Sequence, residues 1–141
     1  MTVRVLDANG IAVPGVTVTF TFPTPSAFSI PASVAAPGLF TASDSQAMAF
    51  NEDRTLNSDA SAAPRGGVLT LYGTGIGDGS LAPIAVNIGG EAAALLSVAP
   101  VADMPGVTML KVRVPRFSGT GSKPVELLAG TETAGATIVV Q

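Results

Sequence analysis

Glycine stands at every second position from residue 73 to residue 79, directly after an apolar run that begins at Val68. The backbone amides of such a loop can cradle phosphate groups when a helix follows, so nucleotide binding is the first chemistry to consider. The dinucleotide fingerprint Gly-x-Gly-x-x-Gly needs glycine at its sixth position, where this chain has Asp78 or Ser80. Pro83 and β-forming residues come next, so no helix is available to receive the phosphates. We therefore predict no bound cofactor, and we interpret the glycines as a tight loop that ends a buried strand.

Oxygen-bearing side chains gather between residues 51 and 59, as they do in calcium-binding loops. The four side chains are Asn51, Asp53, Asn57 and Asp59. A calcium ion needs about six or seven oxygen ligands, including a bidentate carboxylate, and this segment does not supply that set. Its spacing is typical of a hairpin turn in which Asn and Asp bond to their own backbone. The sequence therefore predicts a turn here and no metal site.

Catalytic groups are scarce in this chain. It has no His and no Cys, which removes the commonest general base, the thiolate nucleophile and the commonest transition-metal ligands. Without His, and without a Gly-x-Ser-x-Gly elbow, its serines cannot form the usual triad. Ten acids are scattered mostly in predicted turns: Asp7, Asp44, Glu52, Asp53, Asp59, Asp78, Glu91, Asp103, Glu126 and Glu132. We predict no catalytic residues, and we predict that the chain is not an enzyme.

Aromatic residues bear on carbohydrate binding, because a sugar face packs on an exposed ring. The chain has no Trp, and its one Tyr, Tyr72, ends the most apolar strand, where we expect it to be buried with its hydroxyl hydrogen-bonded. We expect core or edge-covering positions for Phe20, Phe22, Phe28, Phe40, Phe50 and Phe117. Carbohydrate binding is therefore kept as an alternative. Lys111 and Arg113 share one strand face, which we interpret as a solvated face that discourages edge pairing.

The composition favours a folded all-β chain. Of the 141 residues 47% are hydrophobic, enough for a core, while 16 Gly and 11 Pro punctuate the chain too often for long helices. With a net charge of -3 and only seven basic residues, the sequence does not predict a basic surface for binding nucleic acid or anionic lipid. No apolar run reaches the ~18 to 20 residues of a membrane span. Met1 is followed directly by a strand-like segment, so we expect no signal peptide here and interpret the chain as a piece of a longer protein.

Two β-rich runs, residues 2–6 and 13–22, flank a turn at residues 7–10. The second run alternates apolar residues with Thr and predicts one buried face made by Val16, Val18, Phe20 and Phe22. The sequence Val-Arg-Val-Leu-Asp-Ala-Asn-Gly at 3–10, followed by Val-Pro-Gly-Val-Thr-Val-Thr-Phe at 13–20, resembles the opening of invasin-type bacterial immunoglobulin-like repeats. Four prolines between residues 23 and 37 then predict an extended linker or edge segment.

The remaining chain predicts short strands separated by turn signals every 8 to 12 residues, which is typical of an antiparallel sandwich. The predicted strands are residues 39–42, 46–50, 54–57, 68–72, 84–88, 92–98, 107–114, 125–129 and 136–140, with loops at 58–64 and 118–122 and a Gly-Gly turn at 89–90.

The order of motifs from residue 36 onward is similar to an uncharacterised C-terminal domain family abundant in large secreted acidobacterial proteins. The matching segments are 36–40, 49–58 and 64–77, then Ile-Gly-Gly at 88–90 and Val-Arg-Val-Pro at 112–115. The resemblance implies an immunoglobulin-like sandwich at the C-terminus of an exported protein, and it implies no activity. The loop between Gly79 and Ile84 is shorter than is usual in that family.

We predict an all-β protein: an antiparallel immunoglobulin-like β-sandwich over residues 38–141, a linker or edge segment at 23–37, and an N-terminal β-hairpin extension at 1–22. The predicted function is that of a non-catalytic structural or adhesive module of a bacterial secreted or cell-surface protein, able to assemble into a fibre by β-strand addition. The alternative is a carbohydrate-binding module of a secreted hydrolase. Expected partners are neighbouring domains or identical subunits at β-edges, with carbohydrate as the alternative, and expected localisation is extracellular or cell-surface.

Overall fold

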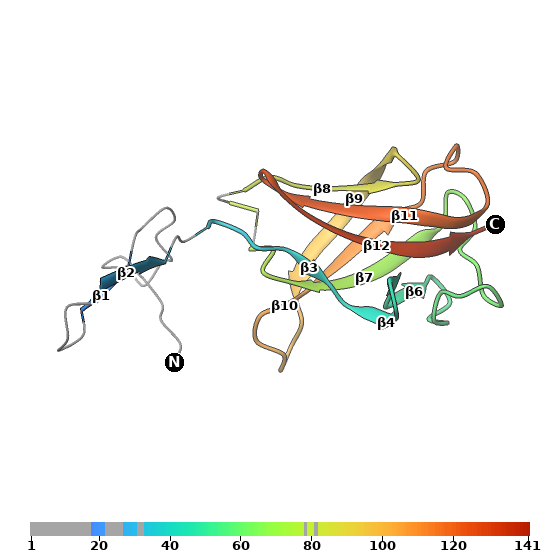
Figure 1. Cartoon of the computed structure of the whole chain (residues 1–141). Coiled ribbons are helices and arrows are strands. Elements are labelled where there is room, and N and C mark those ends of the chain that lie inside the picture. The colour runs from blue at the N-terminus through green and yellow to red at the C-terminus, as the bar shows by residue number, and fades with distance from the viewer. Residues whose placement is uncertain (1–17, 22–26, 31–32, 78, 81) are drawn as a thin grey trace. The chain divides into compact units, whose positions relative to one another are not determined.

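The computed structural model describes residues 18–21, 27–30, 33–77, 79–80 and 82–141. Over these residues the secondary structure consists of β-strands, with no helix, so the predicted all-β class is confirmed. The chain divides into two compact units, Met1–Val34 and Ala35–Gln141. The two units are described separately below (Figure 1).

The described residues of the first unit form a two-stranded antiparallel ribbon. Strand β1 (Val18–Thr21) pairs with β2 (Ala27–Ile30). The partner of β1, strand β2, therefore lies within residues 23–37, the segment whose prolines predicted an extended linker or edge segment. The predicted hairpin between residues 2–6 and 13–22, and its buried face, fall outside the residues whose side chains the structure describes.

The second unit contains ten strands in one continuous sheet that curls into a nearly closed barrel. Its long strands run β7 (Val68–Thr74), β10 (Val107–Arg113), β9 (Glu91–Pro100), β8 (Ile84–Ile88), β11 (Gly121–Ala129) and β12 (Glu132–Val140), each antiparallel to the next. Strand β9 pairs with β8 at its start and with β10 over the rest of its length. It therefore carries the chain from one side of the barrel to the other.

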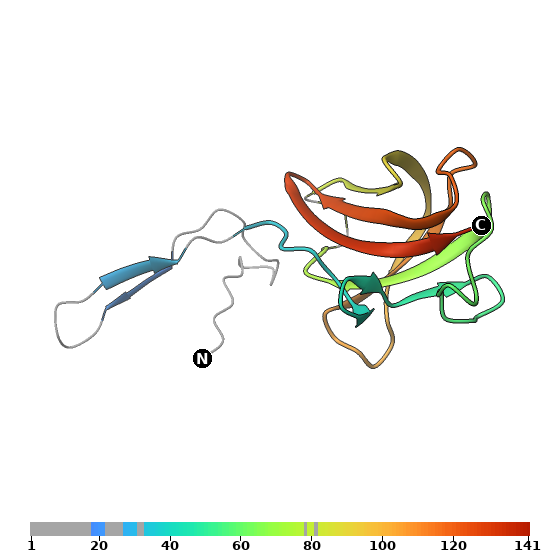
Figure 2. The same ribbon diagram turned by 45° about the vertical axis from the view of Figure 1, so that its right-hand side comes forward.

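Four short strands close the barrel between β7 and β12, and they make the sheet mixed. They are β3 (Gly38–Leu39), β4 (Thr41–Ser43), β5 (Gln46–Ala47) and β6 (Ala49–Asn51). Strands β3 and β6 pair with β7, whereas β5 pairs with β12 in parallel (Figure 2). The prediction of a purely antiparallel sheet is therefore wrong. The reason is that this segment crosses from β7 to β12 and back, so it meets β12 running in the same direction.

The core is aliphatic and follows the two-residue repeat of the strands. In β7 the inward positions are Leu69, Leu71 and Gly73, and the positions between them face outward. Strands β8, β10, β11 and β12 repeat the pattern. The fully buried large side chains are Leu69, Leu71, Ile76, Val86, Ile88, Leu110, Val112, Val114, Val125, Leu127, Ile138 and Val140. Burying a side chain of this size contributes roughly 1.5 to 3 kcal/mol, so these residues hold the barrel together.

Most predicted strands occur within a few residues of their expected bounds, and the exception is residues 54–57. Arg54 has a φ of 69°, in the left-handed region, which ends extended structure there. Leu56 forms a single bridge to Phe50, and Asn57 bonds elsewhere through its side chain. Strand β11 begins at Gly121, inside the predicted 118–122 loop.

Candidate binding groove

The glycine loop after β7 is shaped by backbone geometry. Gly73 lies in β7, and a Cβ there would come within 2.6 Å of the Gly38 carbonyl oxygen of β3. Gly75 has a φ of 66°, and a Cβ on it would collide with the carbonyl of Ala36. Gly77 and Gly79 also have positive φ, at 73° and 83°. The loop therefore needs glycine for close approach and for left-handed turns, without reference to a ligand.

Asn57 closes the barrel by acting as a substitute for a strand. Its side chain is fully buried, at 0% exposure. Its Nδ2 donates to the Val139 carbonyl at 2.8 Å, and its Oδ1 accepts the Val139 amide at 2.7 Å. One amide side chain thus bonds to both backbone groups of a residue on β12, whose carbonyl also accepts the Ala63 amide at 2.9 Å. The Asn57 carbonyl in turn accepts a hydrogen bond of 2.7 Å from the Gln46 side chain.

Asn51 and Asp53 hold the turn that precedes Asn57. Nδ2 of Asn51 donates to the Ser61 carbonyl at 2.8 Å, while Oδ1 of Asn51 accepts from Asn57 at 3.2 Å. Asp53 accepts the hydroxyl and the amide of Thr55 at 2.6 and 3.0 Å. These two bonds, the hydroxyl bond first, hold the pKa of Asp53 below its ordinary value. The predicted turn is present, with the difference that the two Asn side chains bond to remote segments.

The other acids do not assemble into a site in the part of the chain that the structure describes. There, no group of three or more His, Cys, Asp or Glu is placed to hold a metal ion. None of its buried side-chain nitrogen or oxygen atoms lacks a hydrogen-bond partner. No helix in the described ranges is long and apolar enough to cross a membrane.

The aromatic residues correct a sequence-based expectation, because none with a described side chain lies in the core. Tyr72 is half-buried, since the alternation that turns Leu71 and Gly73 inward turns Tyr72 outward. Phe50 is also half-buried, Phe40 is 39% exposed, and Phe117 is 90% exposed. Predicted burial of Tyr72 was therefore wrong, although the alternation of β7 was readable in the sequence.

Two adjoining hollows lie on the outer face of β6, β7 and β10, and together we call them the aromatic groove. Phe50 and Tyr72 stand between the hollows, with their rings perpendicular (89°) and their centroids 6.0 Å apart. The polar hollow, of about 560 Å³, is lined by Phe50, Asn51, Glu52, Arg54, Val68, Thr70, Tyr72, Met109 and Lys111. The apolar hollow, of about 390 Å³, is lined by Phe40, Met48, Phe50, Tyr72, Val101, Met104 and Val107.

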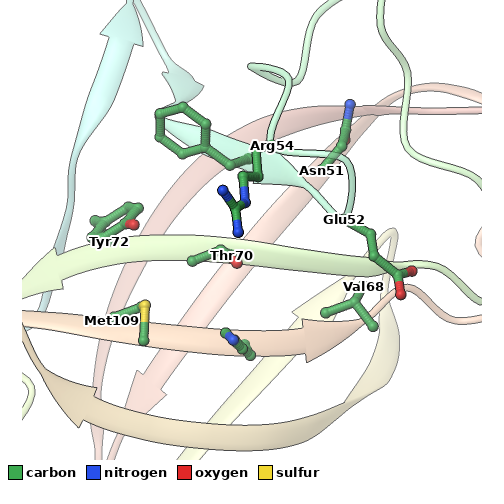
Figure 3. Close-up of a pocket in the computed structure, with 9 residues that line it drawn as sticks. Asn51, Glu52, Arg54, Val68, Thr70, Tyr72 and Met109 are labelled. Carbon is green, nitrogen blue, oxygen red and sulfur yellow. The ribbon is translucent and has the colours of Figure 1, made fainter.

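Strand register fixes the order of side chains along the groove. Thr70 is paired with Lys111, and Tyr72, two residues further along β7, is paired with Met109. In the polar hollow, Glu52 and Val68 lie at one end, and Tyr72 and Met109 at the other (Figure 3). The groove therefore changes from charged to apolar along the strand direction. Rigid strands hold this gradient in place.

Two cations and one carboxylate line the polar hollow: Arg54, Lys111 and Glu52. Arg54 reaches the groove from a turn in which its own backbone is left-handed, an unusual conformation for a residue other than glycine. Lys111 lies on β10, which has β7 on one side and β9 on the other. The interpretation that the Lys111 and Arg113 face guards a sheet edge is therefore wrong, because β10 is an interior strand.

Comparison with protein-family profiles finds no matching family, and comparison with curated proteins finds no match. Among solved structures, the chain is similar to part of a Bacteroides thetaiotaomicron protein described as a "putative phosphatase". The match has a TM-score of 0.40 and 19% identity, and it covers 57% of this chain and 16% of that one. This finding contradicts the prediction that the chain is not an enzyme, and we withdraw that prediction. A likeness this distant transfers no activity.

Proposed function

We propose that this chain is a structural or adhesive module of a bacterial secreted or cell-surface protein, and that it binds its partner through the aromatic groove. The observation that carries the proposal is the position of Tyr72 and Phe50 on the outer face of a rigid sheet, outside an aliphatic core. Exposed apolar hollows of this kind mark interaction sites on soluble domains. Aromatic and Met side chains are enriched at such contacts.

The finer fold that we propose is an immunoglobulin-like sandwich. Strand β9 supports it, since this strand leaves β8 and joins β10, as strands do when they pass between two facing sheets. The resemblance to a C-terminal domain family of secreted acidobacterial proteins stays a prediction. Extracellular localisation rests on it.

Fibre assembly by strand addition is the most specific form of the structural role. Within the described residues β1 and β2 pair only with each other, in a ribbon of four residues a strand. Such a ribbon is marginally stable in water unless it joins a larger sheet. It therefore has the geometry of a strand donor.

Carbohydrate binding is a second candidate, favoured by the polar hollow. There the Tyr72 ring lies in a pocket with the hydroxyl of Thr70, the carboxylate of Glu52 and two cationic side chains. Sugar rings need this combination of an aromatic surface and hydrogen-bonding groups.

A retention assay tests the adhesive role. Beads carrying the full chain are washed over wells coated with extracellular-matrix proteins, mucin, xylan, cellulose or chitin. We expect retention on at least one surface and its loss in Tyr72→Ala. The matched control is Phe117→Ala, which removes an aromatic side chain that is 90% exposed and does not line the groove.

The pattern of retention separates the two candidates. Retention on protein-coated wells supports adhesion to a protein, and retention on polysaccharide alone supports the carbohydrate candidate. Equal retention of Tyr72→Ala and Phe117→Ala would show that the groove is not the binding site, provided that circular dichroism finds both variants folded.

A further inference from the structure

We propose that the aromatic groove recognises an extended protein segment that carries an acidic side chain two residues away from a bulky apolar one. This inference rests on the adhesive function proposed above and names the chemistry of its partner. It is built from three features of the groove: its unpaired cations, its apolar hollow and the distance between them.

The two cations of the groove favour an anionic partner. Within the described ranges, neither Arg54 nor Lys111 takes part in an ion pair or a side-chain hydrogen bond, whereas Arg113 on the same strand donates to the Gly66 carbonyl at 2.8 Å. Two cations face one carboxylate, Glu52, although the whole chain has a net charge of -3. The groove is therefore locally positive on an acidic protein. A carboxylate on the ligand complements it.

The apolar hollow favours a protein side chain over a sugar. Of its lining residues only Tyr72 has a hydroxyl, and the others are Phe, Met and Val. Sugar hydroxyls placed there would lose their hydrogen bonds to water without replacement, at a cost in free energy. Met48 and Met104 are exposed and have flexible thioether side chains, which adapt to apolar groups of different shape. A Phe or Leu side chain fits this chemistry.

The spacing of the two requirements matches an extended peptide. Lys111 and Met109 are two residues apart on one face of β10, and the apolar hollow begins beside Met109's partner Tyr72. Two residues along a strand span roughly 7 Å. A peptide in extended conformation places its residues i and i+2 on one face at the same separation. An acid at i and an aromatic residue at i+2 therefore reach Lys111 and the hollow together.

The experiment is an NMR titration of the ¹⁵N-labelled full chain with the peptide acetyl-Glu-Ala-Phe-amide. We expect saturable shifts of the amides of Thr70, Tyr72, Met109 and Lys111. Three control peptides remove one feature each: Gln for Glu, Ala for Phe, and acetyl-Glu-Phe-Ala-amide, which changes the spacing. An exposed ion pair contributes up to about 1 kcal/mol, so the Gln peptide should bind up to about fivefold more weakly.

A double-mutant cycle assigns the preference for the Glu peptide to the groove. In Lys111→Gln the preference for the Glu peptide over the Gln peptide should be smaller than in the wild type, because only Arg54 is left in the groove, whereas Lys123→Gln, which removes a cation on β11 that does not line the groove, should keep the full preference. The inference is overturned if the Glu peptide shifts no groove amide, or if all four peptides bind alike. If the peptides fail while Tyr72-dependent retention on coated wells persists, this inference falls and the adhesive function stands. If the peptides fail and the Tyr72-dependent retention is also absent, both this inference and the proposed adhesive function are refuted.

Discussion

Replacing Asn57 with Ala should be among the most damaging single changes in the barrel. The change deletes the Nδ2 bond to the Val139 carbonyl, the Oδ1 bond from the Val139 amide and the bond to Asn51. A buried polar group left without a partner costs about 1 to 3 kcal/mol, and the Val139 amide and Asn51 Oδ1 both lose theirs, whereas the Val139 carbonyl keeps the bond from the Ala63 amide at 2.9 Å. Taking about 2 kcal/mol for each group, we expect a loss of about 4 kcal/mol in the free energy of unfolding.

Thermal and urea unfolding followed by circular dichroism measure this loss. For a unit of this size, about 4 kcal/mol corresponds to a fall in Tm of about 15 °C. Asn87→Ala is the matched control, because its side chain makes one exposed hydrogen bond, to Glu126 at 3.1 Å, and should change stability by less than about 0.5 kcal/mol.

A same-sized substitution separates hydrogen bonding from packing. Asn57→Asp keeps the volume and the acceptor for the Val139 amide, but as a carboxylate it cannot donate to the Val139 carbonyl. It should be at least as unstable as Asn57→Ala at neutral pH. If the free energy of unfolding of Asn57→Ala lies within about 1 kcal/mol of the wild-type value, the role of Asn57 in closing the barrel is refuted.

Three further changes test other parts of the structure. Gly75→Ala should cost at least about 3 kcal/mol, because it combines a positive φ with a backbone collision, whereas Gly77→Ala, with positive φ but open space around it, should cost about 1 to 2 kcal/mol; equal losses would contradict the account of the loop. The lowered pKa of Asp53 means that its contribution to stability is present above the unfolded pKa and is lost as the pH falls through the folded pKa; carboxyl NMR titration should show Thr55→Val raising the pKa toward its ordinary value, since only the bond from the residue-55 amide is left, and an unchanged pKa would reject the assigned cause. If strand addition builds a fibre, light scattering should find multimers of the full chain that disappear when residues 1–34 are deleted, and a monomer in both cases would refute it.

Local patterns predicted the strands well where neighbours in sequence are also neighbours in space. The Gly89-Gly90 turn and the apolar runs beside it gave β8 with its observed bounds, Ile84–Ile88, and located β9. The glycine loop was predicted as a turn for the same reason. Its need for left-handed φ is a local property.

Pairings between distant segments could not be predicted in this way. Asn57 bonds to Val139 across 82 positions, and no local pattern announces that a side-chain amide will complete a sheet. The groove could not be predicted for the same reason, because it depends on the strand register that pairs Lys111 with Thr70 and Met109 with Tyr72. The outward orientation of Tyr72 could be inferred from the inward positions of Leu69 and Leu71. The residues that surround Tyr72 in the groove could not.

The parallel contacts of β12 have a mechanical consequence. β5 runs parallel to β12 at Gln46 and Thr137, and Ala63 makes a second parallel bridge to Val140. Tension applied to the two ends of the Ala35–Gln141 unit would pull these parallel segments in opposite directions along their length. Their hydrogen bonds, with those of Asn57 between them, would then bear the load together in shear instead of opening one at a time. The segment that closes the barrel is therefore also its clamp against stretching.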